Sequence, residues 1–344
     1  MSAIVVSATP GLVLDIVGPA SVVDIHGLSV KTTLKNTGDE TLKLLNDPRT
    51  VLSKAKTNTF AISSGSGSPA FTGIKVKYVP SKAVALNNKN AFTVLAPGQS
   101  VEITHDLAGV YNFTLAGAGS YDFGAANVFN YVDASGTLKT IEASTNTHSF
   151  NIAGRLAAGN GYAPALSRRA ITYTGCSSTQ QSQISSAATK ANSYVANANS
   201  YLASHASGTT RYTTWFGTFT SARYNLVVSH FNKIGTDATS LNYDCTTCRT
   251  SNGGQDWDNT YAYVDPNAST IFLCGVFFQA PETGTDSKAG TIVHESSHFT
   301  VNGGVSDHVY GQDGAKALAK SDPNQAVDNA DSHEYFAENN PALS

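Results

Sequence analysis

Several short runs in the first half of the chain alternate apolar with polar side chains, as SVEITHDL does at residues 100–107. Successive side chains of a strand point to opposite faces, so a period of two predicts strands that bury one face. These runs are rich in Val, Ile, Thr and Phe, and are separated by Gly, Pro, Asn and Asp. We predict strands within residues 11–18, 28–36, 74–79, 91–107, 110–116 and 148–154. Their spacing favours an all-β, sandwich-like domain over residues 1–160.

The pattern changes in the second half, where apolar residues recur at helical intervals. Residues 177–205 are rich in Ala and contain neither Pro nor Gly, which predicts a long helix. We predict further helices over residues 221–234, 291–300, 312–320 and 324–338, and strands over residues 260–266 and 270–278. Residues 172–344 are therefore expected to form a second domain of the α+β class, with helices dominant.

A linker over residues 161–171 is predicted between the two patterns, because Gly, Pro and Ala mark the stretch AAGNGYAPALSRRAITYTGC, which begins at residue 157. Within it, Arg168 and Arg169 form a dibasic pair of the kind that processing proteases favour. We expect cleavage between Arg169 and Thr172, which would separate an N-terminal prodomain from a domain that begins at Thr172.

Charge is distributed unevenly along the chain. Residues 1–169 hold 14 Lys and Arg against 10 Asp and Glu, whereas the remaining residues hold 8 against 15. An acidic second half attracts cationic substrates and repels nucleic acid, so we expect no nucleic-acid partner. No apolar run approaches the roughly 20 residues that a membrane-spanning helix needs, so no membrane segment is expected either.

The four cysteines, all in the second half, indicate the compartment. They are Cys176, Cys245, Cys248 and Cys274. An even number within about a hundred residues is typical of two disulfides, although the sequence permits three pairings. The alternative is a redox pair or half of a zinc site at Cys245 and Cys248, but no second close pair of ligands accompanies it. The start of the chain lacks the features of a secretory signal, yet disulfides favour an oxidising, extracellular location.

The stretch TIVHESSHFT at residues 291–300 contains His294, Glu295 and His298. Residues four apart on a helix project from the same face, so the two imidazoles can bind one ion. Glu295 lies beside them and can reach a water on that ion, which is the H-E-x-x-H arrangement of zinc peptidases. A catalytic zinc needs three protein ligands, so one is still missing.

Three kinds of third ligand can be compared. A metzincin would need Gly at 301 and His at 304, where this chain has Val301 and Gly304, and His308 lies off that register. A gluzincin would use a later glutamate, and Glu334 or Glu338 could serve. Asp307 is the remaining candidate. It fits the geometry best, because the glycines at 303 and 304 allow a sharp turn back toward the helix. The residues themselves leave both possibilities open, a later glutamate and Asp307.

The motif resembles the signature of the aspzincin, or deuterolysin, family. After the two histidines come Gly304, Asp307, Tyr310 and Gly311 at the spacing of that family. The stretches TYTGCSS, RYTTWFG, TGTDSKAGTIVHESSHFT and NADSHEYFAENNPA closely resemble the fungal peptidyl-Lys metalloendopeptidases across residues 172–344. Residues 1–169 would correspond to their propeptide. One departure is Val305, where the family usually has Thr, and there we expect only a local packing change.

The resemblance implies a role for each matching residue. Zinc, one ion per chain, would be held by His294, His298 and Asp307, with Glu295 as general base and Tyr310 as a hydrogen-bond donor to the oxyanion. Asp331 and Glu334, three apart on one helix face, would bind a lysine ammonium. It also implies that Cys176 pairs with Cys245, and Cys248 with Cys274.

These observations predict a secreted, monomeric zinc endopeptidase in precursor form that cleaves polypeptides on the amino side of lysine. The prodomain would act in cis as inhibitor and folding aid, and Lys54 or Lys56 would place an ammonium in the acidic pocket. One alternative is a deuterolysin-type zinc protease of broader specificity. Another is a non-catalytic secreted binding protein whose zinc is structural.

Overall fold

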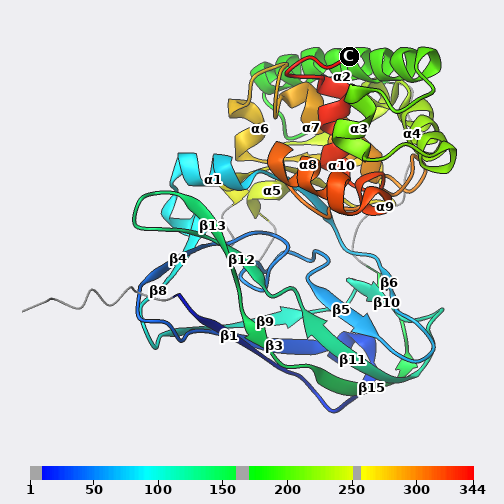
Figure 1. Ribbon diagram of the computed structural model, residues 1–344. Coiled ribbons are helices and arrows are strands. Elements are labelled where there is room, and N and C mark those ends of the chain that lie inside the picture. The colour runs from blue at the N-terminus through cyan, green and yellow to red at the C-terminus, as the bar shows by residue number, and fades with distance from the viewer. Residues whose placement is uncertain (1–9, 160–169, 251–256) are drawn as a thin grey trace, which may run out of the picture. The chain divides into compact units, whose positions relative to one another are not determined.

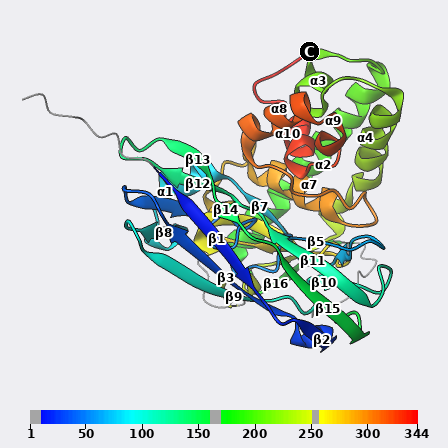
Figure 2. The same ribbon diagram turned by 60° about the horizontal axis from the view of Figure 1, so that its bottom comes forward.

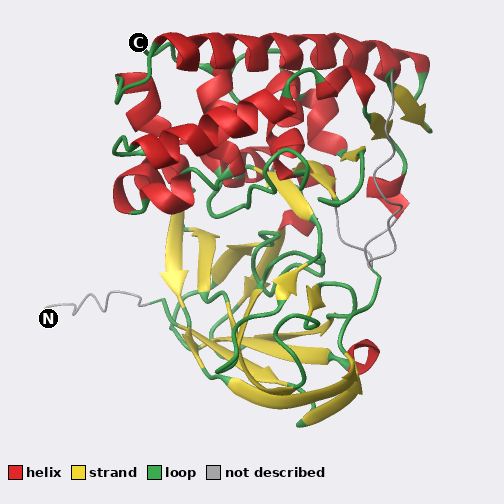
Figure 3. Ribbon diagram, turned by 90° about the vertical axis from the view of Figure 1, so that its right-hand side faces the viewer, coloured by secondary structure: helices red, strands yellow, loops and turns green. Residues whose placement is uncertain are grey.

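The chain is described by a computed structural model that covers residues 10–159, 170–250 and 257–344. Its contacts divide the chain into two compact units (Figure 1). The first contains residues 1–73 and 80–161, and the second contains residues 74–79 and 162–344. Strands dominate the first unit and helices the second (Figure 3), as the sequence pattern predicts. A continuous domain over residues 1–160 was expected, but residues 74–79 belong to the second unit.

The first unit consists of small β-sheets. Its strands are β1 (Leu12–Val17), β2 (Ser21–Asp24), β3 (Ser29–Asn36), β4 (Leu42–Leu45), β5 (Phe60–Ser63), β6 (Ala70–Phe71), β8 (Phe92–Leu95), β9 (Ser100–Asp106), β10 (Tyr111–Asn112), β11 (Gly119–Ala125), β12 (Val128–Val132), β13 (Leu138–Glu142), β14 (Ser144–Thr145) and β15 (His148–Arg155). They pair in the orders β14-β1-β3-β9, β2-β15-β11-β5, β13-β12-β4-β8 and β10-β6. Three short helical segments, η1 (Ile25–Gly27), α1 (Pro80–Leu86) and η2 (Lys89–Ala91), connect them.

The period of two in the sequence accounts for the core of this unit. Along β3, Val30, Thr32 and Leu34 are buried, whereas Ser29, with the lysines at 31 and 35, faces solvent. Strand β3 lies between β1 and β9 and is antiparallel to both (Figure 2). The inward side chains of the sheets form one hydrophobic cluster. Alternation of this kind is what an antiparallel sheet with one covered face requires.

A five-stranded sheet supports the second unit, in the order β16-β17-β19-β18-β7. Its strands are β16 (Thr172–Thr174), β17 (Asn242–Asp244), β19 (Thr270–Leu273), β18 (Thr260–Val264) and β7 (Lys75–Tyr78). The first three are parallel, and β18 runs antiparallel to β19. Strand β7 comes from the N-terminal half and pairs antiparallel with β18, with Lys77 opposite Ala262. The edge of this sheet is therefore supplied by a segment distant in sequence.

Helices cover most of the second unit. They are α2 (Ser178–Ser204), α3 (Thr210–Phe216), α4 (Ser221–Ile234), η3 (Asp237–Ser240), α5 (Thr247–Thr250), η4 (Trp257–Asn259), α6 (Gly275–Gln279), α7 (Lys288–His298), α8 (Gly311–Ser321), α9 (Pro323–Ala326) and α10 (Ala330–Glu338). Helix α7 packs against α2, α10, β18 and β7, which buries every residue of it. No helix in the described ranges is long and apolar enough to cross a membrane.

Most predicted helices are confirmed, with local corrections. Helix α2 begins after Ser177, which forms a capping box with Gln180, and α4 has the predicted bounds. The strand predicted over residues 270–278 ends at Leu273, because the chain turns into α6 at Gly275. The helix predicted over residues 324–338 is two helices, α9 and α10. Helix α3 was not predicted, since seven residues carry too little periodicity.

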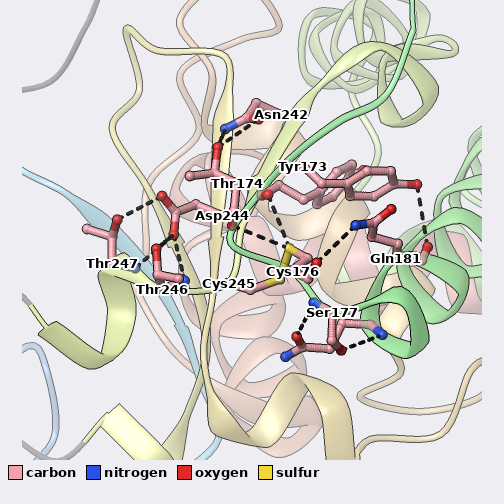
Figure 4. Close-up of a disulfide and its surroundings, with 12 residues drawn as sticks. Tyr173, Thr174, Cys176, Ser177, Gln181, Asn242, Asp244, Cys245, Thr246 and Thr247 are labelled. Atoms are coloured by element: carbon pink, nitrogen blue, oxygen red, sulfur yellow. Dashed lines mark hydrogen bonds between the residues drawn. A yellow bond between two sulfur atoms is a disulfide. The ribbon is translucent and has the colours of Figure 1, made fainter.

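Two disulfides join parts of the second unit. Cys176 pairs with Cys245, and Cys248 pairs with Cys274, which is the pairing that the family resemblance implies. Cys176 and Cys245 follow the adjacent parallel strands β16 and β17, so their side chains meet at the same sheet end (Figure 4). Since Cys245 and Cys248 bond different partners, a redox pair or half of a zinc site at these two residues is excluded.

Candidate active site

Helix α7 presents the two histidines. Ser287 caps its N-terminus by accepting the Gly290 N–H at 2.9 Å. Apolar residues of the helix, such as Ile292, pack into the core and leave His294 and His298 one turn apart on the face toward β7. Their ring centroids are 4.8 Å apart. Both side chains are fully buried, so their nitrogens need polar partners.

The glycine bend after α7 returns the chain to this face. The N–H groups of Gly303 and Gly304 both donate to the Phe299 carbonyl at 3.1 Å. Their φ angles are 155° and 68°, a region that residues with a Cβ rarely adopt. Asp307 follows, and its Oδ1 lies 3.2 Å from His294 Nε2 and 3.3 Å from His298 Nε2. The geometry expected for Asp307 is therefore present.

These three atoms have the spacing of metal ligands. Two ligands of a tetrahedral zinc, each about 2.0–2.1 Å from the ion, lie about 3.3 Å apart. Among the described residues, none of the three atoms has a hydrogen-bond partner of acceptable geometry, although all are buried. His298 Nδ1 donates to the Val305 carbonyl at 2.6 Å, which leaves Nε2 as the free nitrogen. The donor set fits a divalent ion such as zinc.

A second cluster shares His294. Its Nδ1 lies 2.8 Å from Asp331 Oδ1 and 3.2 Å from Glu334 Oε2, which are also within metal-binding distance of one another. However, both carboxylates contact the ammonium of Lys77, so a metal ion has no place there while β7 is paired with the sheet. Glu338, the other gluzincin candidate, belongs to neither cluster, because its Oε1 accepts from the N–H and Oγ of Ser287.

His308 also lies outside both clusters. Its Nε2 is 2.8 Å from Asp328 Oδ2, and its backbone N–H donates to Asn329 Oδ1. These contacts fix the loop that carries Asp307, since Ser306 is bridged to Asn329 as well. His308 therefore supports the site without facing it.

Glu295 is fully buried beside the histidines. Its Oε1 accepts the backbone N–H of Lys77 at 3.1 Å, and among the described residues its Oε2 has no hydrogen-bond partner. Burial raises the pKa of the Glu295 carboxyl well above its ordinary value, although the charge of His294 opposes the shift. A carboxyl with a raised pKa and a free oxygen can both accept and donate a proton.

Lys77 enters an acidic pocket. Its Nζ lies 2.9 Å from Asp331 Oδ1, 2.7 Å from Glu334 Oε2 and 3.4 Å from Asp286 Oδ1, and its side chain is fully buried. The ring of Tyr335 lies 5.0 Å from Nζ. Burial alone would lower the pKa of this ammonium, but the surrounding carboxylates outweigh it and raise the pKa well above its ordinary value. A buried ion needs such partners.

Two of these pocket residues were missed by sequence reasoning. Asp286 lies within the stretch TGTDSKAG that resembles the family, and Tyr335 follows Glu334 directly. Tyr335 donates its hydroxyl hydrogen to Asp286 Oδ1 at 2.6 Å, which holds that carboxylate at the pocket. Asp331 is held similarly, since its Oδ2 accepts the Gly311 N–H at 2.6 Å. The positions of Asp331 and Glu334 on one face of α10 are as predicted.

The expectation that Lys54 or Lys56 fills the pocket is wrong. Lys56 Nζ donates to the Ala108 carbonyl at 2.9 Å within the first unit, and Lys54 lies in the same unit. Lys77 occupies the pocket because β7, and not the loop at 54–56, adds to the sheet. The alternation of Lys75 and Lys77 in IKVKYV was visible in the sequence but predicted only a strand.

The remaining predicted residues are placed as follows. The ring of Tyr310 lies edge-on to that of Tyr78, with centroids 5.8 Å apart. Thr172 begins β16, whereas Arg168 and Arg169 lie outside the described residues.

His333 is a neutral core histidine on α10. Its Nδ1 donates to the Asn329 carbonyl at 3.0 Å, so its Nε2 accepts from His230 Nδ1 at 3.1 Å. Burial, followed by the charge of His230, lowers the pKa of His333 to about 3. Below pH 6.5 the unfolded chain therefore binds a proton that the folded chain does not. The free energy of unfolding consequently decreases as the pH is lowered.

This stability change can be measured. From His333 alone, the free energy of unfolding should fall by about 2 kcal/mol between pH 7 and pH 5. The measurement is urea unfolding of chelator-treated protein at both pH values, with His333→Phe as the comparison. The wild type should lose more stability than the variant, by about that amount, and equal losses would show that His333 is charged in the folded state.

The chain is similar to known metalloendopeptidases over nearly its whole length. Residues 201–338 match the family described as lysine-specific metallo-endopeptidase. The chain is 52% identical to the peptidyl-Lys metalloendopeptidase of Grifola frondosa, over 99% of this chain and 97% of that one. Its identity to the corresponding protein of Armillaria mellea is 50%, over 100% and 96%. A solved zinc peptidase from Grifola frondosa is 53% identical and covers 49% of this chain and 100% of its own, with a TM-score of 0.46.

Such extensive identity defines the chain as a zinc-dependent metalloendopeptidase. It belongs to the aspzincin family of lysine-specific metallo-endopeptidases, so the resemblance seen in the sequence is confirmed. The alternative of a non-catalytic binding protein with structural zinc is excluded.

Proposed function

We propose that the chain is the precursor of an endopeptidase that hydrolyses peptide bonds on the amino side of lysine. The position of Lys77 is the main observation that supports this proposal. Its ammonium lies between Asp331 and Glu334, while its own backbone nitrogen lies 3.1 Å from Glu295 Oε1. A lysine bound in this pocket therefore brings the bond on its amino side to the proposed base.

The metal would be held by His294, His298 and Asp307. When bound, zinc lowers the pKa of a coordinated water and polarises the peptide carbonyl. The carboxylate of Asp331, 2.8 Å from His294 Nδ1, orients that imidazole and increases its basicity. The Val305 carbonyl does the same for His298. The departure at position 305 leaves this contact intact, because the backbone makes it.

Glu295 is proposed as the general base and acid. Its carboxylate takes a proton from the attacking water and passes it to the nitrogen of the leaving amine. The distance from its Oε1 to the Lys77 nitrogen supports the second transfer. Tyr310 is proposed to donate a hydrogen bond to the developing oxyanion. Its support is the family motif and its position beside Tyr78, the residue after Lys77.

The N-terminal region, residues 1–160, is proposed to act as inhibitor and folding aid in cis. The contribution of β7 to the sheet of the second unit supports this role, because a strand of the N-terminal half forms one edge of that sheet. Removal would follow cleavage between Arg169 and Thr172. The two disulfides support secretion, since they persist in oxidising compartments.

Lysine preference is expected to depend on the acidic pair. Glu334→Gln should lower kcat/KM for cleavage before lysine by about 10²–10³-fold or more, since loss of one partner of a buried ion pair costs about 3–5 kcal/mol. Asp331→Asn should do the same and also weaken zinc binding about tenfold, because Asp331 contacts His294. The measurement is cleavage of a peptide library by the processed enzyme.

The matched control is Asp313→Asn, which removes an exposed carboxylate of α8. It should leave the cleavage pattern unchanged. Wild-type enzyme that cleaves the library without preference for lysine would instead support the deuterolysin type of broader specificity. Wild-type preference that survives in both pocket variants would place lysine recognition elsewhere.

A further inference from the structure

Strand β7 contacts the site along its whole length. Its pairing with β18 is antiparallel, with Val76 opposite Tyr263 and Lys77 opposite Ala262. Addition of an extended segment to a sheet edge is a common way to bind a peptide, in which the backbone gives affinity and side-chain pockets give specificity. The pocket for Lys77 supplies that specificity here.

The register of β7 places one particular bond at the site. The Val76 N–H donates to Asp307 Oδ2 at 3.0 Å, and the Lys77 N–H donates to Glu295 Oε1 at 3.1 Å. The peptide bond between Val76 and Lys77 therefore lies between a proposed metal ligand and the proposed base. It is also the bond on the amino side of the lysine in the pocket, as the proposed specificity requires.

Residues on either side hold this register. Lys75 Nζ donates to the Val305 carbonyl at 2.7 Å and to that of Gly304. It therefore binds the glycine bend that precedes Asp307. On the other side, the ring of Tyr78 packs against Tyr310. Successive side chains of a strand point to opposite faces. A shift of the pairing register by one residue would therefore remove Lys77 from its pocket.

We propose that β7 is an internal substrate mimic. Lys77 fills the lysine pocket, the Val76–Lys77 bond takes the place of the scissile bond, and no lysine substrate enters while β7 is in place. This inference rests on the proposed function, and it assigns the regulation of that site. It also assigns Tyr310 as the contact surface for the second substrate residue after the scissile bond.

Amine labelling tests occupancy without metal or activity. Metal-free wild-type chain is treated with formaldehyde and cyanoborohydride, and dimethylation of each lysine is followed by mass spectrometry. Lys77 should be labelled at least about tenfold more slowly than the exposed Lys89, because a closed state protects it in proportion to its population. Denaturant should remove the difference. Equal rates in the native chain would overturn the proposal.

Activity of the intact, zinc-loaded chain tests the block. Lys77→Met keeps most of the length of the side chain but removes its charge, so it should open the pocket to substrate. Intact Lys77→Met is expected to hydrolyse a lysine peptide at least about tenfold faster than intact wild type. The reason is that the apparent affinity for the peptide depends on the fraction of chains whose lysine pocket is open. Lys89→Met, the matched control, should behave as wild type. Mass spectrometry during the assay verifies that each chain is uncleaved.

The two hypotheses fail in different ways. Processed wild-type enzyme that shows no cleavage before lysine would contradict the proposed function. Processed enzyme that cleaves before lysine, with intact wild type equally active, would overturn the internal mimic alone. Should Lys77→Met not fold, as circular dichroism would show, the labelling of the wild type still decides the question.

Discussion

Glu295→Gln is expected to leave the enzyme with zinc but almost without activity. Loss of a general base and acid lowers rates by about 10²–10⁴-fold, and the amide of glutamine cannot take up the proton. Zinc should be retained, because Glu295 belongs to neither cluster of possible metal ligands. The measurements are kcat/KM on a lysine peptide and zinc content per chain, both on processed enzyme.

Asp313→Asn is again the matched control and should match wild type in both measurements. Full activity of Glu295→Gln would remove Glu295 as the base. Loss of zinc from this variant would show instead that the substitution disturbs the neighbouring histidines, and a rate comparison would then say nothing about proton transfer.

Asp307→Ala is expected to lose both zinc and activity. Outer-shell partners of a metal are worth about 10–100-fold in affinity, and removal of a direct ligand should cost more than that. Two histidines remain in the variant, and they are too few for a catalytic zinc. Zinc affinity is measured by competition with a chromophoric chelator, on the wild type and the variant in parallel.

Glu334→Gln is the informative comparison, because Glu334 was the competing third ligand. If Asp307 binds the metal, Glu334→Gln should retain zinc within about tenfold while Asp307→Ala loses it. The reverse order would identify the site as one with two histidines and a glutamate. It would also remove Glu334 from the proposed lysine pocket, so this pair of variants tests both assignments.

Local signals in the sequence were sufficient for much of this structure. The helix at 178–204 begins at a capping box between Ser177 and Gln180, and these two residues lie within a stretch of four. The H-E-x-x-H spacing and the two glycines before Asp307 indicate the candidate metal-binding cluster for the same reason. Everything needed to bring these three side chains together lies within one helix and one bend.

Contacts between distant segments were not predictable in this way. Strand β7 has the alternation of any half-buried strand, and nothing local indicates that it pairs with β18 rather than with its neighbours in sequence. The choice of Lys77 over Lys54 and Lys56 depends on that pairing. Asp286 was missed because its role depends on Tyr335, 49 residues away. At Cys274, the strand ends where a disulfide and a helix begin, which apolar periodicity does not reveal.

The position of β7 at the sheet edge would have a consequence for the proposed mature enzyme. If the proposed processing removes β7, β18 would expose a row of backbone donors and acceptors, which is a surface prone to self-association with other chains. Such an enzyme is least prone to self-association when another polypeptide covers this edge. Dilution and abundant substrate should therefore preserve the processed protein during storage, whereas concentrated, substrate-free solutions should favour its aggregation.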